Sequence, residues 1–127
     1  KKKIDRYNLK QNIFLIGFKN TVFKYLKKCE AFILSSLWED PGFVIVEAMY
    51  SNSFVISSNC ESGPKEIISN HRGILFKNNS KDDFIEKFSK FIQLDNKERI
   101  DIKLNAKKFT KEFSLLKHFK RIENILS

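Results

Sequence analysis

Residues 31–57 read AFILSSLWEDPGFVIVEAMYSNSFVIS, and this stretch decides the fold. Its first four residues, 31–34, form a continuous apolar run that stops at two serines. Short apolar runs that end at polar turns are typical of buried parallel strands. We expect the proline and glycine at 41–42 to open a helix that runs to about residue 50, and a second strand to follow at 54–56. This order predicts a parallel sheet with a crossover helix.

The same alternation continues on both sides of this unit. Upstream, the apolar run at 13–16 is stopped by a glycine and predicts another buried strand, and a short helix is expected at 20–28. Downstream, a short helix is expected at 65–69 and a strand at 73–76. Alternating strands and helices predict an α/β fold with a Rossmann-like, doubly wound parallel sheet flanked by helices. We place this sheet region at about residues 5–78.

Beyond the sheet region the chain becomes helical. Apolar residues recur at helical spacing over 81–93, and further helices are expected over 96–113 and 115–126. This helical tail, about residues 80–127, packs on the sheet or reaches to a neighbouring part. Because no linker or low-complexity stretch marks a boundary, we interpret residues 1–127 as a single partial domain.

The chain is basic. Its 127 residues contain 24 Lys and Arg against 15 Asp and Glu, which gives a net charge of +9. Lys, Asn, Ile and Phe are all abundant, as a biased base composition of the gene would produce. One interpretation is therefore that the charge reflects this composition and serves no specific partner. A basic surface also suits an anionic membrane or a polyanionic substrate. Nucleic acid is disfavoured, because the basic residues are scattered and no recognition motif is visible.

The cysteines and histidines give no indication of a metal site. Cys29 and Cys60 have no Cys or His partner at ligand spacing, so we interpret them as free thiols in a reducing compartment. His71 and His118 are isolated. No apolar run approaches the ~20 residues that span a bilayer, and no signal peptide is visible. We therefore expect a cytoplasmic location, with peripheral contact to the inner face of the membrane as an option.

Two glutamates, Glu39 and Glu47, stand out in the deciding stretch, with seven residues between them. Glu39 is at the mouth of a loop, and Glu47 is inside an almost wholly apolar run. An ionised carboxylate in apolar surroundings is costly unless something pairs with it. We therefore expect Glu47 to bond backbone amides or a polar ligand such as a sugar hydroxyl. The helix N-terminus between the two glutamates also favours an anion at this edge of the sheet.

An ordered series of five sequence blocks runs through the chain. These blocks are Asn12-Ile13-Phe14-Leu15-Ile16-Gly17-Phe18, Glu39 with Glu47-Ala48-Met49, Phe54-Val55-Ile56-Ser57, Gly63-Pro64-Lys65-Glu66-Ile67-Ile68, and Gly73-Ile74-Leu75-Phe76. In these blocks the chain resembles the donor-binding half of the retaining family-four glycosyltransferases, which have the GT-B fold. The likeness covers roughly residues 5–95.

The resemblance implies roles for five residues. Glu39 would contact hydroxyls of the donor sugar and serve catalysis, and Glu47 would bind the ribose of the nucleotide. Backbone amides of Gly42, Phe43 and Val44 would approach the sugar or its diphosphate. The donor would be a nucleoside diphosphate sugar, and the acceptor a glycan, lipid or polysaccharide that receives a hexose with retention. The family needs no metal cofactor, because amides and protein cations oppose the diphosphate charge.

The chain departs from the family pattern in two ways. Asp40-Pro41 follows the first glutamate where the family has Gly-Phe, and a proline offers no N–H. The family's diphosphate-binding Arg and Lys have no counterpart in Lys1–Lys10, and the N-terminal acceptor domain is missing. We therefore expect a fragment of the C-terminal donor-binding domain, inactive alone. A non-catalytic truncated or split-partner module, and another nucleotide-binding α/β protein such as an epimerase, are the alternatives.

Overall fold

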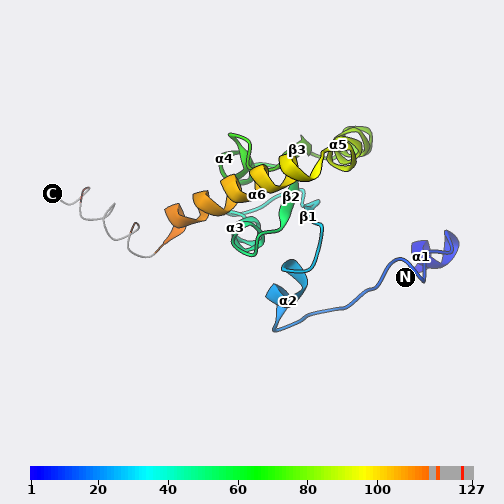
Figure 1. The fold of residues 1–127 in the computed structure, drawn as a ribbon. Coiled ribbons are helices and arrows are strands. Elements are labelled where there is room, and N and C mark those ends of the chain that lie inside the picture. The colour runs from blue at the N-terminus through cyan, green and yellow to red at the C-terminus, as the bar shows by residue number, and fades with distance from the viewer. Residues whose placement is uncertain (115–116, 118–123, 125–127) are drawn as a thin grey trace.

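The computed structural model describes residues 1–114, 117 and 124 (Figure 1). At its centre is a sheet of three parallel strands in the order β1-β2-β3. The strands are β1 (Ala31–Leu34), β2 (Phe54–Asn59) and β3 (Ile74–Lys77). In register, Ile56 of β2 lies beside Ile33 on one side and Ile74 on the other. The predicted parallel sheet is confirmed for these three strands.

Helices cover both faces of the sheet. The crossover helices α3 (Phe43–Tyr50) and α4 (Pro64–Ile68) both contact β2, and α5 (Lys81–Gln93) packs on β3. The long helix α6 (Asn96–Phe109) crosses the sheet in Figure 1 and contacts β2 and α3. A 3-10 turn, η1 (Thr110–Phe113), follows it. These helices agree closely with the ranges expected from the sequence, and the helix expected over 115–126 lies, residues 117 and 124 apart, outside the described residues.

Strand β2 carries the core because successive side chains of a strand point to opposite faces. Val55 packs into one buried cluster with apolar residues of α3 and α4. Its neighbours Phe54 and Ile56 pack into a second cluster with Phe76 and Phe91. The two rings of Phe54 and Phe91 have centroids 4.8 Å apart. Helix α6 contributes to both clusters, so it ties the two faces together.

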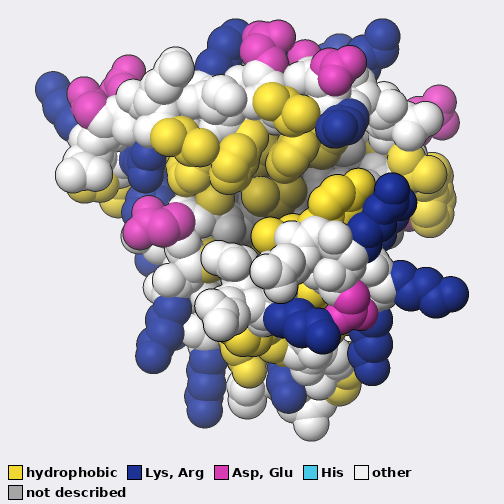
Figure 2. Space-filling model, turned by 90° about the vertical axis from the view of Figure 1, so that its right-hand side faces the viewer, with side chains coloured by type: hydrophobic (Ala, Val, Ile, Leu, Met, Phe, Trp, Pro, Cys, Tyr) yellow, Lys and Arg dark blue, Asp and Glu magenta, His cyan; other side chains and the backbone are white. Residues whose placement is uncertain are grey.

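Strand β1 was expected to be buried, and it is instead a half-buried edge. Only β2 pairs with it among the described strands, and the side chain of Ile33 is 41% exposed. Between β1 and α5 lies a hollow of about 480 Å³ that includes Ile33, Leu37 and Phe84. Figure 2 shows the side on which α5 lies in Figure 1, and hydrophobic side chains gather in a hollow at its centre.

The strand predicted at 13–16 is wrong. This run is extended but unpaired, and its apolar side chains are exposed, with Phe14 at 72%. The short helix α1 (Lys2–Arg6) precedes it, and the whole segment lies away from the sheet in Figure 1. An apolar run indicates burial but does not supply the neighbour that a strand needs for its hydrogen bonds. None of the three described strands lies beside this run.

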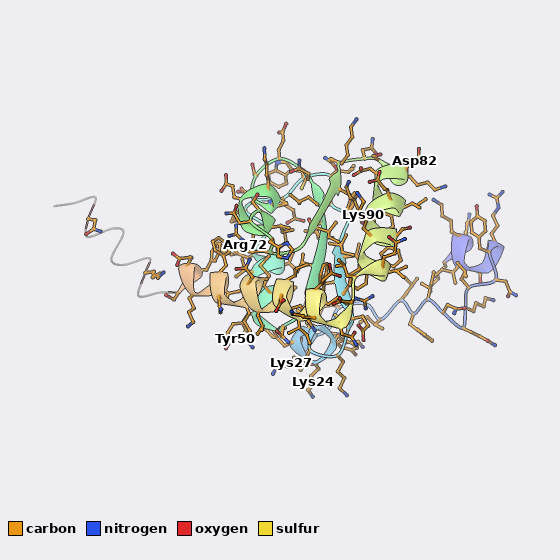
Figure 3. All side chains as sticks on the ribbon, turned by 45° about the horizontal axis from the view of Figure 1, so that its top comes forward. Lys24, Lys27, Tyr50, Arg72, Asp82 and Lys90 are labelled. Atoms are coloured by element: carbon orange, nitrogen blue, oxygen red, sulfur yellow. The ribbon has the colours of Figure 1, made fainter. Side chains whose placement is uncertain are left out.

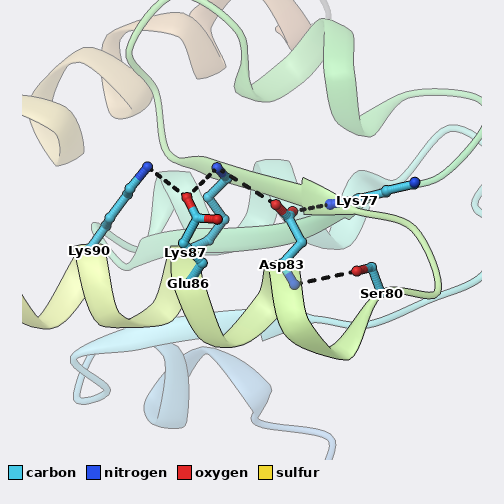
Figure 4. Close-up of polar contacts among 6 residues, drawn as sticks. All are labelled: Lys77, Ser80, Asp83, Glu86, Lys87 and Lys90. Atoms are coloured by element: carbon cyan, nitrogen blue, oxygen red, sulfur yellow. Dashed lines mark hydrogen bonds and ion pairs between the residues drawn. The ribbon is translucent and has the colours of Figure 1, made fainter.

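Helix α5 is held in place by hydrogen bonds of side chains at its start. The hydroxyl of Ser80 accepts a hydrogen bond from the backbone N–H of Asp83 at 3.3 Å, which caps the helix. Asp83 in turn accepts from the backbone N–H of Lys77 at 2.5 Å, which ties the helix to the end of β3 (Figure 4). Further along the helix, Glu86 pairs with Lys87 at 3.3 Å and Lys90 at 2.9 Å.

Candidate functional site

The loops that follow the three strands meet at the carboxyl edge of the sheet, which is where ligands bind in such folds. Three contacts join these loops. They are a hydrogen bond of 2.5 Å from the Ser58 hydroxyl to the Ser36 carbonyl, a bond of 2.9 Å from the Asn78 amide to the Leu37 carbonyl, and a parallel backbone bridge between Trp38 and Glu61. The loop that carries Glu39 is therefore held from two sides.

Two glycines let these loops approach each other closely. Gly42 has a φ of 81°, the left-handed conformation that glycine adopts without steric cost, and it caps the start of α3. Gly63 has a φ of 111°, and a Cβ there would collide with the backbone carbonyl of Pro41. Pro41 itself follows a cis peptide bond. The loop before α3 thus packs directly on the loop before α4.

The N-terminus of α3 presents free backbone donors. Because glycine has no side chain, Gly42 provides no side-chain cap for the helix. The first N–H groups of a helix have no intrahelical acceptor, so those of Phe43 and Val44 remain available. The phenyl ring of Phe43 is exposed and Val44 is half-buried, while Gly42 is buried. Such a helix end suits an anion such as a diphosphate.

Glu39 lies next to this helix end. Its Cβ is 3.8 Å from the position that a Cβ on Gly42 would occupy. The side chain is half-buried, and among residues 1–114, 117 and 124 it makes no hydrogen bond or ion pair. The structure therefore places the Cβ of a residue with an unpaired carboxylate beside Gly42, at the start of α3. Its predicted contact with a donor sugar stays a prediction.

Glu47 is exposed, so the expectation of apolar surroundings is wrong for this residue. The apolar neighbours Ile45, Ala48 and Met49 are on the buried face of α3, whereas Glu47 is on the outward face with Phe43. Residues four apart share a helix face, and adjacent ones do not. Among the described residues, the Glu47 carboxylate has no side-chain partner either.

An open groove of about 580 Å³ runs along the outward face of α3. Its lining includes Glu47 and Phe43, the aromatic side chains of Phe23 and Tyr50, and Lys111 of η1. Glu39 is not among its lining residues. Glu47 therefore lies in this groove, whereas Glu39 lies beside Gly42 at the start of the helix.

Three groove residues, Phe23, Tyr50 and Lys111, have no signal in the sequence that predicts their place in the groove. They come from separate elements, and no motif connects them. The edge-on ring contact of Phe43 with Phe113, at a centroid distance of 6.4 Å, shows how closely η1 approaches α3. Only the folded arrangement brings these side chains to one groove.

Arg72 is a further residue whose position no local sequence pattern predicts. It is buried and donates from Nε to the carbonyl of Ile67 at 2.6 Å and from Nη2 to that of Glu66 at 2.8 Å. Its guanidinium lies 3.7 Å from the ring centroid of Phe109. Burial lowers the pKa of this guanidinium, which nevertheless stays charged at neutral pH. Arg72 thus fastens the carboxyl end of α4 to α6.

Metal-binding clusters and membrane-spanning helices are both absent from the part of the chain that the structure describes. No group of three or more His, Cys, Asp or Glu side chains in that part of the chain lies in a position to hold a metal ion. No helix in the same part is both long and apolar enough to cross a bilayer.

Comparison with protein families matches residues 1–109 to the glycosyl transferases group 1. The chain belongs to this family. The family predicted from the ordered sequence blocks is thereby confirmed. The roles of individual residues within this group 1 chain are not tested by the match.

Two curated relatives of the group 1 chain show how much of a longer protein the chain matches. It is 42% identical over 65 residues to an uncharacterized glycosyltransferase of Methanocaldococcus jannaschii, covering 51% of this chain and 16% of that protein. It is 28% identical over 115 residues to the N-acetylgalactosamine-N,N'-diacetylbacillosaminyl-diphospho-undecaprenol 4-alpha-N-acetylgalactosaminyltransferase of Campylobacter jejuni, covering 90% of this chain and 31% of the relative. The chain spans less than a third of either relative.

Solved structures confirm the fold. TarM of Staphylococcus aureus superimposes with a TM-score of 0.81 at 26% identity, over 97% of this chain and 25% of TarM. Anabaena HepE, solved with UDP-glucose, gives a TM-score of 0.84 at 22% identity, over 98% of this chain and 35% of HepE. The C-terminal domain of LpcC from Francisella tularensis gives 0.73 at 24% identity, over 90% and 60%. The group 1 chain therefore has the Rossmann-like α/β architecture of part of a GT-B glycosyltransferase.

Proposed function

We propose that the chain binds the nucleoside diphosphate sugar donor of a retaining glycosyltransferase. The observation that carries the proposal is a pair of carboxylates without a side-chain partner among the described residues. Glu39 lies beside Gly42 at the start of α3, where the helix has no side-chain cap, and Glu47 lies on the outward face of the same helix. A carboxylate accepts two hydrogen bonds from a vicinal diol, which both a sugar and a ribose provide. Helix-end amides stabilise an anion. The geometry thus matches the three chemical parts of the donor in order.

The donor would lie across the first turn of α3. The sugar would be at Glu39, the diphosphate at the N–H groups of Phe43 and Val44, and the ribose at Glu47. Phe43 and Glu47 share the outward face and line one groove, so a nucleotide can follow that face from the helix end. The base then reaches the aromatic side chain of Tyr50, whose ring face suits stacking.

In the transfer reaction, negative charge develops on the departing diphosphate. Amides fixed at the end of a helix stabilise that charge without rearranging, which lowers the barrier. Glu39 would hold the sugar hydroxyls so that the reacting carbon faces the acceptor. Retention would have the acceptor enter on the face that the diphosphate leaves. Donor binding needs no divalent ion in this proposal, and affinity should be equal in Mg²⁺ and in EDTA.

The transfer itself belongs to the whole protein and is proposed for it. The Campylobacter jejuni relative is named for a lipid-linked acceptor and HepE was solved with UDP-glucose. These names support a UDP-sugar donor and a glycan or lipid-linked acceptor, held by an acceptor domain outside this chain. A cytoplasmic site of action at the membrane surface is part of the same proposal.

Titration of the chain with UDP-, GDP- and ADP-sugars by ligand-observed NMR tests donor binding. We expect one nucleotide to bind, and Glu47→Gln to weaken both the sugar nucleotide and the free nucleotide by about tenfold, as the loss of a charge-assisted bond implies. Glu39→Gln should weaken only the sugar nucleotide, because Glu39 is assigned to the sugar.

Asp101→Asn is the matched control, since Asp101 is an exposed carboxylate on α6. It should leave binding unchanged. Equal loss in all three variants would show an effect of net charge, and no binding of any nucleotide would overturn the donor assignment for this chain.

A further inference from the structure

A second surface of the chain combines lysines with exposed apolar side chains. Helix α2 (Val22–Leu26) and the residues after it form a shallow hollow of about 540 Å³, lined by Lys24, Tyr25, Lys27, Lys28 and Cys29. We refer to this hollow, with the flanking side chains of residues 18–23, as the α2 surface. Figure 3 shows Lys24 and Lys27 directed away from the sheet, on the opposite side of the molecule from Asp82.

The apolar side chains of the α2 surface are large and open to solvent. Phe18 is 91% exposed, Phe23 41% and Tyr25 45%, and Val22 is also exposed. Within α2, only Leu26 is buried. A soluble helix normally turns such side chains inward. Here aromatic groups and lysines share the outward side, which a purely solvated surface does not require.

The charge of this surface is almost all of one sign. Residues 18–30 contain four lysines, at 19, 24, 27 and 28, and a single acid, Glu30. All four lysines are exposed. The carboxylate of Glu30 lies 3.8 Å from the guanidinium of Arg99 on α6, so it is shared with another cation. The α2 surface is therefore a local positive patch and not an even sample of the basic chain.

The α2 surface is also fixed to the body of the domain. The carbonyl of Leu26 accepts hydrogen bonds from the Ser53 hydroxyl at 2.5 Å and the Cys29 thiol at 3.2 Å. The side chain of Leu26 packs into the same buried cluster as Ile45 and Met49 of α3. An attachment to α2 would therefore orient α3, and the groove beside Glu47, relative to whatever α2 contacts.

We propose that the α2 surface docks on an anionic lipid bilayer. Lysines beside a bilayer are attracted by acidic head groups, and aromatic side chains lie favourably at the boundary between head groups and acyl chains. A nucleic acid would satisfy the lysines but would leave Val22 and Phe23 without a partner. The proposal rests on the membrane-surface site of action proposed above and not on donor binding, because no nucleotide takes part in the contact.

Vesicle co-sedimentation of the chain tests this proposal. We use vesicles of phosphatidylcholine alone and of phosphatidylcholine with 30% phosphatidylglycerol, at low and high salt. Binding is expected only with phosphatidylglycerol and should weaken as salt screens the lysines. Each lysine at such a surface contributes roughly a fivefold factor. The triple variant Lys24→Glu, Lys27→Glu and Lys28→Glu should therefore reduce partitioning by roughly a hundredfold or more.

The matched control makes the same change of net charge elsewhere. Lys2→Glu, Lys81→Glu and Lys97→Glu alter three exposed lysines on α1, α5 and α6. This variant should keep most of the binding, and Tyr25→Ser alone should weaken it without changing the net charge. Circular dichroism checks that all variants fold.

Equal loss in the two triple variants would show that total charge and not the α2 surface is responsible, and would overturn the proposal. So would absence of binding to acidic vesicles, or binding to heparin alone. Because the assay contains no nucleotide, failure here leaves the donor-binding proposal untouched, and failure of donor binding leaves this one standing.

Discussion

Arg72 shows how a single side chain can position a loop of the candidate site from behind. It holds the last carbonyls of α4 and covers the ring of Phe109, so α4 cannot rotate away from α6. The first residues of α4 follow Gly63, which packs against the loop of Pro41. A change at Arg72 should therefore alter the packing of the loops at the carboxyl edge of the sheet, although Arg72 itself contacts no ligand in our proposal.

We expect Arg72→Met to lower the free energy of unfolding by about 2 kcal/mol, since it removes two charge-assisted hydrogen bonds and a cation–π contact. Arg72→Lys should recover little of this, because a lysine cannot contact both carbonyls in the same geometry. Urea unfolding measures the change. Arg6→Met is the control: Arg6 lies on exposed α1 and should cost almost nothing. Equal losses at the two positions would contradict the assigned role.

At the residue scale, the roles predicted for the site residues stay predictions, and only their placement can be compared with the structure. It selected Glu39, Gly42 and Phe43, and the structure places these three at one helix end. The environment of Glu47 was predicted wrongly, because an apolar stretch was treated as apolar surroundings. A helix separates neighbours in sequence onto different faces, so helical phase and not local composition decides exposure. Lys111 and Tyr50 carried no local signal, since only tertiary contacts bring them to the groove.

Among the elements, α5 has the most direct link from sequence to structure. Its observed range is the predicted 81–93, because Ser80 caps its start and its apolar residues recur at helical spacing. The predicted strand at 13–16 failed for a different reason. A helix satisfies its own backbone hydrogen bonds, whereas a strand needs a partner that the local sequence does not specify.

The ion pairs on the exposed face of α5 predict the pH at which the Glu86 carboxyl titrates. Side-chain bonds from Lys90 and Lys87 hold the pKa of Glu86 below its ordinary value. A carboxyl whose pKa is lower in the folded than in the unfolded state contributes stability at pH values above its unfolded-state pKa. This contribution is lost as the pH falls through its folded-state pKa. We expect the Glu86 carboxyl signal in an NMR titration to have a midpoint below about 4.3, the reference for glutamate.

Lys90→Met should move this midpoint upward, as should high salt, because the pair is exposed and screened. Lys81→Met, on the same helix but outside the cluster in Figure 4, should not move it. A midpoint that ignores Lys90→Met would show that the ion pair does not persist in solution.

For the whole molecule, burial is distributed unevenly along the chain. All of β2 except Asn59 is buried, and it is paired on both sides and covered by helices on both faces. Residues 10–19 are exposed throughout and pair with nothing among the described strands. Strand β1, whose free edge lies beside the apolar hollow at α5, is intermediate in burial. Such a gradient predicts local opening with very different free energies in one chain.

Amide hydrogen exchange measured by NMR should reveal this gradient. We expect the N–H groups of 55–58 to exchange only on global unfolding, because each lies inside the sheet and opening them requires the loss of both buried clusters. Amides of 13–19 should exchange at nearly the rate of an unfolded chain. Those of β1 should be protected to an intermediate degree, since β2 bonds one side only.

Ile56→Ala sharpens the test: a cavity at a fully buried side chain costs about 2–5 kcal/mol, which should accelerate exchange in β2 while leaving 13–19 unchanged. Protection of 13–19 as strong as that of β2 would mean that this run pairs as a strand in solution, as its sequence predicted.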